Sequence, residues 1–297
     1  MRWSAGDRGN IEDMRGRSGG GGGGMIPLGI GGFVIVALLS MFTGVNFFDI
    51  LGGGGGSAGP TPVGTSGSSS STPPANTTPS EERLVDMVDA VARDAQGTWR
   101  QLLGDRYQAT KVVLFRDSIQ SACGYAQSAT GPFYCPGDRK VYLDLGFFDD
   151  LQRRFGASGD FAQAYVLAHE IGHHIQTITG TENRVRESQQ ADPRNMNAMS
   201  VRLELQADCY AGVWGHEAAK PGRAAQGKVE LDPGDLEEAL RAASAIGDDR
   251  LQKLGTGRVM PEKFTHGSSE QRVTWFKRGF DNGDPRQCDT FGTSGTR

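Results

Sequence analysis

The chain has 297 residues, and its 31 lysines and arginines against 35 aspartates and glutamates leave a formal net charge of −4. Because no basic run is long enough to follow a phosphate backbone, this balance argues against nucleic acid as a partner. Residues 49–79 are rich in Gly, Ser, Pro and Thr and cannot bury a core, so they predict a linker ahead of a single globular domain at residues 80–297.

An apolar segment near the N-terminus predicts a membrane anchor. Residues 25–48 carry no charge and are long enough to cross a bilayer as one transmembrane helix. A cleaved signal peptide is the alternative, but its apolar core is shorter and ends at a small-residue cleavage site. Four arginines precede the segment, whereas the linker has no lysine or arginine; they are Arg2, Arg8, Arg15 and Arg17. The positive-inside rule therefore predicts a single-pass membrane protein with a cytoplasmic N-terminal segment at residues 1–24 and a periplasmic or extracellular domain.

The periodicity of the domain predicts an α+β fold that is mostly helical. A helix is expected to begin near Ser80, because apolar residues recur at helical spacing from Leu84 to Trp99. Two strand-like runs at residues 111–115 and 141–145 predict a small antiparallel sheet. Further helices, separated by Gly and Pro, are predicted at residues 160–179, 196–219, 234–254 and 268–281.

The four cysteines of the domain predict two disulfide bonds in an oxidising compartment rather than a zinc ribbon. Pairing Cys123 with Cys135 would close a short loop, and pairing Cys209 with Cys288 would tie a helix to the C-terminal tail. Four buried thiols are the alternative. A domain outside the cytoplasm favours the two bridges.

The sequence HEIGH at residues 169–173 matches the HExxH pattern, which is typical of zinc peptidases. Histidines four residues apart share one face of a helix, so their nitrogens can converge on one metal ion. Glu170, about 100° around the helix, can reach a water molecule on that metal. A capping-box pattern at Asp160 and Gln163 and a stop at Gly180 place the motif in the middle of a helix. The alternative is a pair of histidines that only pack or face solvent.

A hydrolytic zinc site needs a third protein ligand and one open position for water. Glu204 is the candidate, because Glu204 and Asp208 are four residues apart on one face of an apolar, alanine-rich helix. Glu204 would complete the ligand set with His169 and His173. Asp208 would then accept a hydrogen bond from the other nitrogen of a ligand histidine. The alternative is a pair of solvated helix carboxylates.

HExxH followed by a helix with an ExxxD pattern looks like the gluzincin metallopeptidases, and within them the chain resembles the bacterial predicted neutral zinc metallopeptidase family. The resemblance covers nearly the whole chain, including the stretches GPFYCPGDRKVYLDLGFF, VLAHEIGHHIQ, RLELQADCYAGVW and FTHGSSEQRVTWFKRGF. It implies a zincin-like fold and one zinc ion per chain, with His169, His173 and Glu204 as ligands. It also implies that an edge strand at residues 141–144 lines the cleft, where an extended peptide could pair with it.

Three further histidines follow the two in the motif pattern. His174 points about 100° away from His173 and so is not expected to share its metal. His216 has no motif around it. His266 opens a later helix and resembles a histidine segment of related gluzincins, so His266 or Arg272 is a candidate for stabilising the oxyanion of the tetrahedral intermediate.

Together these patterns predict a membrane-anchored zinc peptidase that hydrolyses a peptide or protein substrate. The metal would polarise the scissile carbonyl and lower the pKa of its water, while Glu170 takes the proton and passes it to the leaving amine. One alternative is a membrane-tethered binding or scaffolding module with a closed, structural zinc, although such a site has no use for Glu170. Another is a latent enzyme in which residues 181–200 form a polar lid.

Overall fold

The computed structural model describes residues 1–16 and 77–292. The transmembrane helix predicted at residues 25–48 lies outside these residues, as does nearly all of the linker predicted at residues 49–79. Within the described ranges, no helix combines the length and the apolar character that crossing a membrane requires. The elements of the described part confirm the α+β class, with a small sheet and a mostly helical domain.

The main sheet of the described residues has four strands in the order β1-β2-β6-β5. They are β1 (Ile11–Asp13), β2 (Lys111–Phe115), β6 (Lys140–Asp144) and β5 (Phe133–Cys135). β1, β2 and β6 run parallel, and β5 pairs antiparallel with β6. The expectation that the runs at residues 111–115 and 141–145 pair antiparallel is therefore wrong. The chain between them forms a hairpin and then β5, which makes it long enough for a parallel crossover.

Side chains alternate between the two faces of this sheet, and both faces are covered. Leu114 on β2 and Leu143 on β6 face the main core under the helices. Val113 and Tyr142, their neighbours along the chain, face the other side. There they pack against a hairpin made of β3 (Ser118–Ser121) and β4 (Gly124–Gln127).

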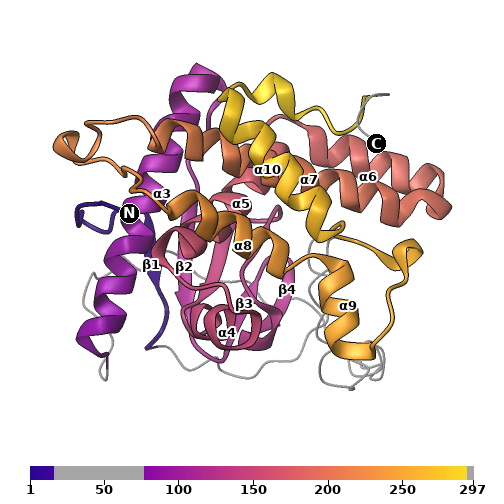
Figure 1. Ribbon diagram of the computed structural model, residues 1–297, viewed down its shortest axis with the longest axis horizontal. Helices are drawn as coiled ribbons and strands as arrows, with labels where there is room; N and C mark the ends of the chain where they lie inside the picture. Colours follow the sequence, from indigo (N-terminus) through magenta and orange to yellow (C-terminus); the bar gives the residue numbers. More distant parts are fainter. Residues whose placement is uncertain (17–76, 293–297) are drawn as a thin grey trace, which may run out of the picture.

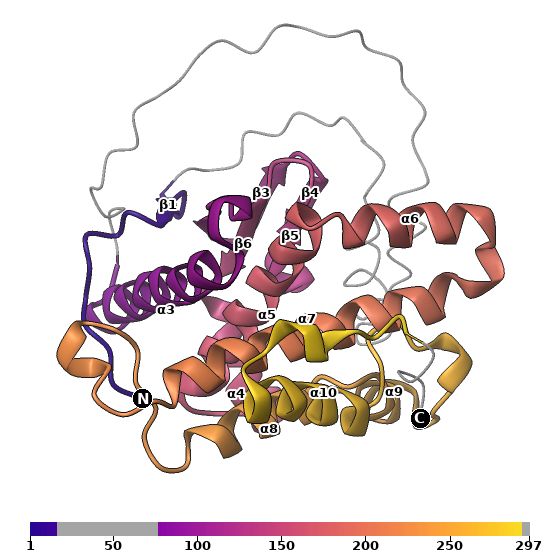
Figure 2. The ribbon, with the colours of Figure 1, turned by 90° about the horizontal axis from the view of Figure 1, so that it is seen from above.

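Helix α5 (Asp160–Ile178) lies at the centre of the molecule, as Figures 1 and 2 show. On one side it contacts β5, β6 and the long helix α3 (Pro79–Leu103). On the other side it contacts α7 (Met196–Ala218) and α8 (Asp235–Ala245). Helix α10 (Ser269–Asn282) packs in turn against α7 and α8. The helix that carries the HExxH motif is therefore covered on both sides.

The predicted helices are present, but one of them is broken. The helix predicted at residues 234–254 consists of α8 and α9 (Asp248–Thr256), with Gly247 between them. A side chain at Gly247 would collide with the start of helix α10 (Ser269–Asn282), because the backbone nitrogen of Ser269 lies 2.3 Å from the ideal Cβ position of Gly247. Two helices go beyond the elements that the periodicity predicts, namely α4 (Gly146–Phe155) and α6 (Thr181–Ala191).

The start of α5 also differs from the prediction. No capping box forms at Asp160, and the residue before the helix is Gly159, whose φ of 114° favours glycine. The backbone N–H of Phe161 instead donates to the carboxylate of Glu238 on α8, at 3.1 Å. A tertiary contact, rather than the helix's own first turn, therefore satisfies the N-terminus of the motif helix.

Both predicted disulfide bonds are present. Cys123, in the turn of the β3–β4 hairpin, is bonded to Cys135 in β5. Cys209 in α7 is bonded to Cys288, which follows α10. The second bond therefore ties the C-terminal part of the described chain to the helix that also carries Glu204.

Helices α7 and α10 cross at two glycines that leave no room for a methyl group. An ideal Cβ on Gly279 would lie 1.9 Å from the carbonyl oxygen of Cys209, and one on Gly212 would lie 2.0 Å from that of Phe276. We expect Gly279→Ala to lower the free energy of unfolding by about 1–3 kcal/mol, because α10 has to move away from α7. Urea denaturation of the purified protein measures this change.

Gly97→Ala in α3 is the matched control for that substitution. No atom lies within 4 Å of the ideal Cβ position of Gly97. In the interior of a helix, alanine in place of glycine is expected to raise the free energy of unfolding by about 0.5–1 kcal/mol. A Gly279→Ala variant as stable as the parent would contradict the close crossing of α7 and α10.

Candidate metal centre

Helix α5 presents the HExxH residues on a buried surface that faces α7. His169 and Glu170 are only 6% and 8% exposed. Gly172 lies against α7, because its ideal Cβ position is 3.0 Å from the carbonyl oxygen of Ala207. A larger residue at this position would push the two helices apart. The glycine of the motif therefore allows Glu204, which lies one turn before Ala207, to reach the histidines.

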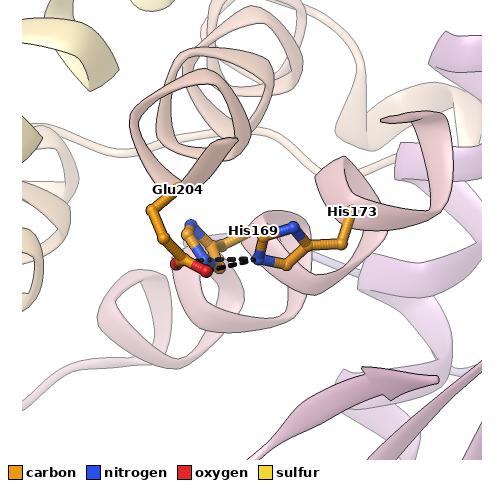
Figure 3. Close-up of side chains that lie close together, drawn as sticks. All are labelled: His169, His173 and Glu204. Carbon is orange, nitrogen blue, oxygen red and sulfur yellow. Dashed lines mark hydrogen bonds and ion pairs between the residues drawn. The ribbon is translucent and has the colours of Figure 1, made fainter. Parts of the chain in front are cut away.

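Three side chains from the two helices converge on one point, as Figure 3 shows. The Nε2 atoms of His169 and His173 are 3.2 Å apart. The Glu204 carboxylate places Oε2 3.1 Å from Nε2 of His169 and Oε1 3.4 Å from Nε2 of His173. Ligands that surround zinc tetrahedrally at 2.0–2.1 Å lie about 3.3 Å from one another. The predicted group His169, His173 and Glu204 is thus brought together at a spacing that fits a zinc ion.

The outer nitrogen of each histidine is held by a neighbouring side chain. Nδ1 of His169 lies 2.8 Å from Oδ1 of Asp208, and Nδ1 of His173 lies 2.8 Å from Oε1 of Gln176. Because a carboxylate or amide oxygen can only accept, Nδ1 of a neutral imidazole carries the proton in both contacts. The Nε2 lone pairs then point at the common centre, as metal coordination requires. Asp208 lies where its predicted role places it.

Asp208 is itself fixed by two buried groups. Tyr165 donates its hydroxyl to Oδ1 of Asp208 at 2.5 Å, and Arg272 donates to both carboxylate oxygens at 2.8 Å. Burial alone would raise the pKa of Asp208, but the charges of Arg272 and His169 lower it to about 2. Arg272, proposed from the sequence as an oxyanion donor, is instead engaged with Asp208 and so orients the carboxylate behind His169.

The charges around the centre favour a cation there. Burial opposes a charged His169, yet the carboxylates of Asp208 and Glu204 raise its pKa to about 9. The pKa of His173 is also raised, because Glu204 outweighs the effect of burial. For Glu204 itself, the two histidines overcome burial and hold its pKa well below the ordinary value. A divalent metal ion would supply the same positive charge while leaving both imidazoles neutral.

A cleft of about 920 Å³ opens over this group and is lined by Glu170 as well as by the three converging residues. Burial raises the pKa of Glu170. Among the described residues, none forms a hydrogen bond with its carboxylate. Glu170 is therefore free to interact with a molecule that enters the cleft.

The edge strand beside this cleft is β5, which covers the first half of the segment at residues 141–144 that the resemblance implies as the edge. That segment belongs to β6, which pairs with β2 on one side and with β5 on the other. Val141 and Tyr142 are therefore paired on both sides, whereas Leu143 and Asp144 are paired with β2 alone. Phe133 and Tyr134 of β5 line the cleft, and β5 has one partner strand among the described residues.

His266 lines the same cleft and is 5% exposed. Its Nδ1 lies 3.1 Å from Oδ1 of Asp248, the first residue of α9. The other oxygen of Asp248 accepts the backbone N–H groups of Thr265, His266 and Gly267 at 2.7, 2.6 and 3.1 Å. Asp248 therefore fixes both the ring and the loop of His266. The break between α8 and α9 is what places Asp248 there.

The other two histidines have structural contacts. Nδ1 of His174 lies 3.1 Å from the hydroxyl of Tyr134, and its Nε2 lies 2.6 Å from the carbonyl oxygen of Gln108. Nδ1 of His216 lies 2.7 Å from the carbonyl oxygen of Phe280. Neither belongs to the converging group, in agreement with the sequence-based expectation.

The sequence patterns miss Tyr165, Gln176 and Asp248. Gln176 follows His173 by three residues on the same helix, and Tyr165 precedes His169 by four, so helical spacing could indicate both. Asp248 is separated from His266 by 18 residues, and no pattern connects the two.

The family described as "Putative neutral zinc metallopeptidase" matches residues 1–291. The uncharacterized protein YpfJ of Escherichia coli K12 is 46% identical over 305 aligned positions, covering 99% of this chain and 100% of that protein. The uncharacterized proteins Mb2605 of Mycobacterium bovis and Rv2575 of Mycobacterium tuberculosis are each 44% identical over 208 positions, covering 69% of both chains. No solved structure matches the chain significantly.

Proposed function

The chain belongs to the family described as putative neutral zinc metallopeptidases, and from this premise we propose that it hydrolyses peptide bonds with one zinc ion held by His169, His173 and Glu204. The observation that carries the proposal is a three-ligand group that opens into a cleft containing Glu170. A purely structural zinc is usually closed by four protein ligands. An open position beside an unpaired carboxylate therefore favours hydrolysis over the scaffolding alternative.

When bound, zinc supplies a Lewis acid that polarises the scissile carbonyl and makes a water molecule more acidic. Glu170 accepts the proton of that water as it attacks and then delivers the proton to the leaving amine. Asp208 and Gln176 keep Nε2 of both histidines directed at the centre throughout. His266, in its doubly protonated form, keeps the N–H of Nδ1 on Asp248 and donates the N–H of Nε2 to the oxyanion that develops on the former carbonyl.

The substrate is proposed to be a peptide or protein segment in extended conformation. The edge position of β5 beside the cleft supports this, because an extended chain can add its backbone hydrogen bonds to an unpaired strand edge. Phe133 and Phe147 belong to the cleft wall, so apolar side chains next to the scissile bond are expected to be accommodated.

The compartment is proposed to be outside the cytoplasm. Two disulfide bonds are present among the described residues, and such bonds persist in oxidising compartments. The apolar stretch at residues 25–48 supports attachment to the membrane.

Removal and restoration of zinc test the proposed function. The purified full chain is treated with a chelator, dialysed, and assayed on a denatured protein substrate before and after one equivalent of zinc is added. Activity is expected to disappear with the metal and return with zinc. Activity that survives complete removal of the metal, as verified by elemental analysis, would rule out the zinc mechanism.

His266→Ala is expected to lower kcat by about 10²–10³-fold, because the oxyanion loses one preorganised donor. Zinc content should not change, since His266 is not part of the converging group. The matched control is His216→Ala, because His216 contacts the carbonyl of Phe280 away from the cleft. Steady-state hydrolysis of a fluorogenic peptide measures both variants. An unchanged kcat for His266→Ala would assign His266 a structural role.

A further inference from the structure

We propose that residues 1–16 are an integral outer part of the domain, and that they therefore lie on the same side of the membrane as residues 77–292. This inference goes beyond the proposed peptidase function and does not depend on it. It rests on a strand pairing, on buried ion pairs and on polar groups that residues 1–16 satisfy.

The first observation is the strand β1, which extends the sheet. Ile11, Glu12 and Asp13 lie opposite residues 112–114 of β2 in a parallel register. Beyond the strand, the N–H of Met14 donates to the carbonyl oxygen of Leu114 at 2.8 Å. Figure 1 shows this N-terminal segment, in indigo, next to the start of α3. The segment is hydrogen-bonded into the sheet and does not merely touch the surface.

The second observation is a set of ion pairs with the first turns of α3. The side chain of Arg15 is 0% exposed and contacts Glu81 at 2.8 Å and Glu82 at 2.9 Å. Arg8 contacts Glu82 at 2.6 Å and Asp86 at 2.7 Å. A guanidinium that is buried in this way is stabilised only while its carboxylate partners are present. Arg15 therefore belongs inside the folded domain.

The third observation is that Asn10 satisfies buried polar groups of α3. Its side-chain amide donates to Oδ1 of Asp89 at 3.1 Å and accepts from Nε2 of Gln96 at 3.0 Å. Asp89 is 0% exposed and Gln96 is 3% exposed. Without Asn10, these groups would lose hydrogen bonds that burial makes costly to replace. Buried polar side chains of α3 therefore depend on the N-terminal segment for their hydrogen bonds.

These contacts change the topology expected from the positive-inside rule. Of the arginines on which that rule relies, Arg2, Arg8 and Arg15 form ion pairs with the domain. Paired strands lie about 4.8 Å apart, far less than the thickness of a bilayer. A single crossing between residues 16 and 77 would place β1 and β2 on opposite sides and break their pairing. The expected cytoplasmic N-terminal segment is therefore replaced in this proposal by one on the side of the domain.

Cysteine labelling of the full chain in bacterial spheroplasts tests the proposal. All four native cysteines are paired, so a single new cysteine reports its own side of the membrane. Ala5→Cys reports the N-terminal segment, and Gln101→Cys on α3 reports the domain, since both positions are exposed. A membrane-impermeant maleimide is applied before and after lysis, with the parent chain as the background control.

The two reporters are expected to behave alike: both react before lysis, or both react only after it. Labelling of Gln101→Cys before lysis together with labelling of Ala5→Cys only after lysis, or the reverse, would overturn the proposal. Equal labelling supports it whichever side the domain occupies, so this outcome is independent of the peptidase function.

Thermal unfolding of the purified full chain in detergent provides a second measurement. Arg15→Ala is expected to lower Tm by at least about 5 °C, because it removes the buried centre of the ion-pair cluster. Arg153→Ala is the matched control, since Arg153 is 72% exposed and its ion pair among the described residues is with Asp149 on the surface. A Tm for Arg15→Ala equal to that of Arg153→Ala would contradict the integral role of residues 1–16.

Discussion

Replacing Glu170 with glutamine should leave zinc binding intact and reduce peptide hydrolysis by at least about 10²-fold. Glutamine has nearly the same size and shape as glutamate but cannot take a proton from water. Glu170 does not belong to the group that converges on the metal, so its replacement should not alter zinc content. Elemental analysis gives the zinc content, and hydrolysis of a fluorogenic peptide at saturating concentration gives kcat.

Glu187→Gln is the matched control for this variant. Glu187 is an exposed residue of α6, and the substitution makes the same chemical change away from the cleft. It should retain both zinc and activity. If Glu170→Gln keeps the full kcat, Glu170 is not the general base and the proposed mechanism is wrong.

Replacing a proposed zinc ligand should lower zinc binding itself, in contrast to Glu170→Gln, which should lower hydrolysis but keep zinc. His169→Ala and Glu204→Ala each remove one of the three converging groups. We expect zinc affinity to fall by more than the 10–100-fold that loss of an outer hydrogen-bond partner costs, as in Asp208→Asn. Activity should fall with the metal content. Competition with a zinc-binding dye measures the affinities.

The variants of the metal centre should differ in zinc affinity in a fixed order. The order of zinc affinity should be parent, then Asp208→Asn, then Glu204→Ala, while Glu187→Ala on the exposed face of α6 should match the parent. Circular dichroism verifies that each variant is folded. Zinc affinity equal to that of the parent in Glu204→Ala would remove Glu204 from the ligand set.

The residues of the centre could be proposed from the sequence because helical spacing places them in two pairs. His169 and His173 share a face of one helix, and Glu204 and Asp208 share a face of another. Two such pairs need only one crossing of helices to form the observed group. The disulfide partners are similarly constrained, because four cysteines allow few pairings.

Features that depend on long-range packing do not follow from local patterns. The parallel pairing of β2 with β6 arises from a crossover that strand-like runs do not reveal. The start of α5 is held by Glu238, which is 77 residues away from Phe161. Asp248 reaches His266 only because Gly247 breaks a helix against α10. In each case a tertiary contact overrides what the neighbouring residues indicate.

The contacts of residues 1–16 also depend on long-range packing that local sequence patterns do not indicate. In the sequence, their arginines indicate a charge bias next to an apolar segment. In the structure, Arg8 and Arg15 form ion pairs with acidic residues of α3. Composition gives the number of charges, but it does not show which of them are already paired.

Digestion of a broad peptide library, followed by mass spectrometry, tests the central claim most directly. The zinc-loaded full chain and its Glu170→Gln variant are compared under identical conditions, with one zinc per chain verified in both. Cleavage at defined peptide bonds by the parent alone is the predicted result. No cleavage by the zinc-loaded parent, or equal cleavage by both proteins, would contradict a zinc peptidase that uses Glu170 as its base.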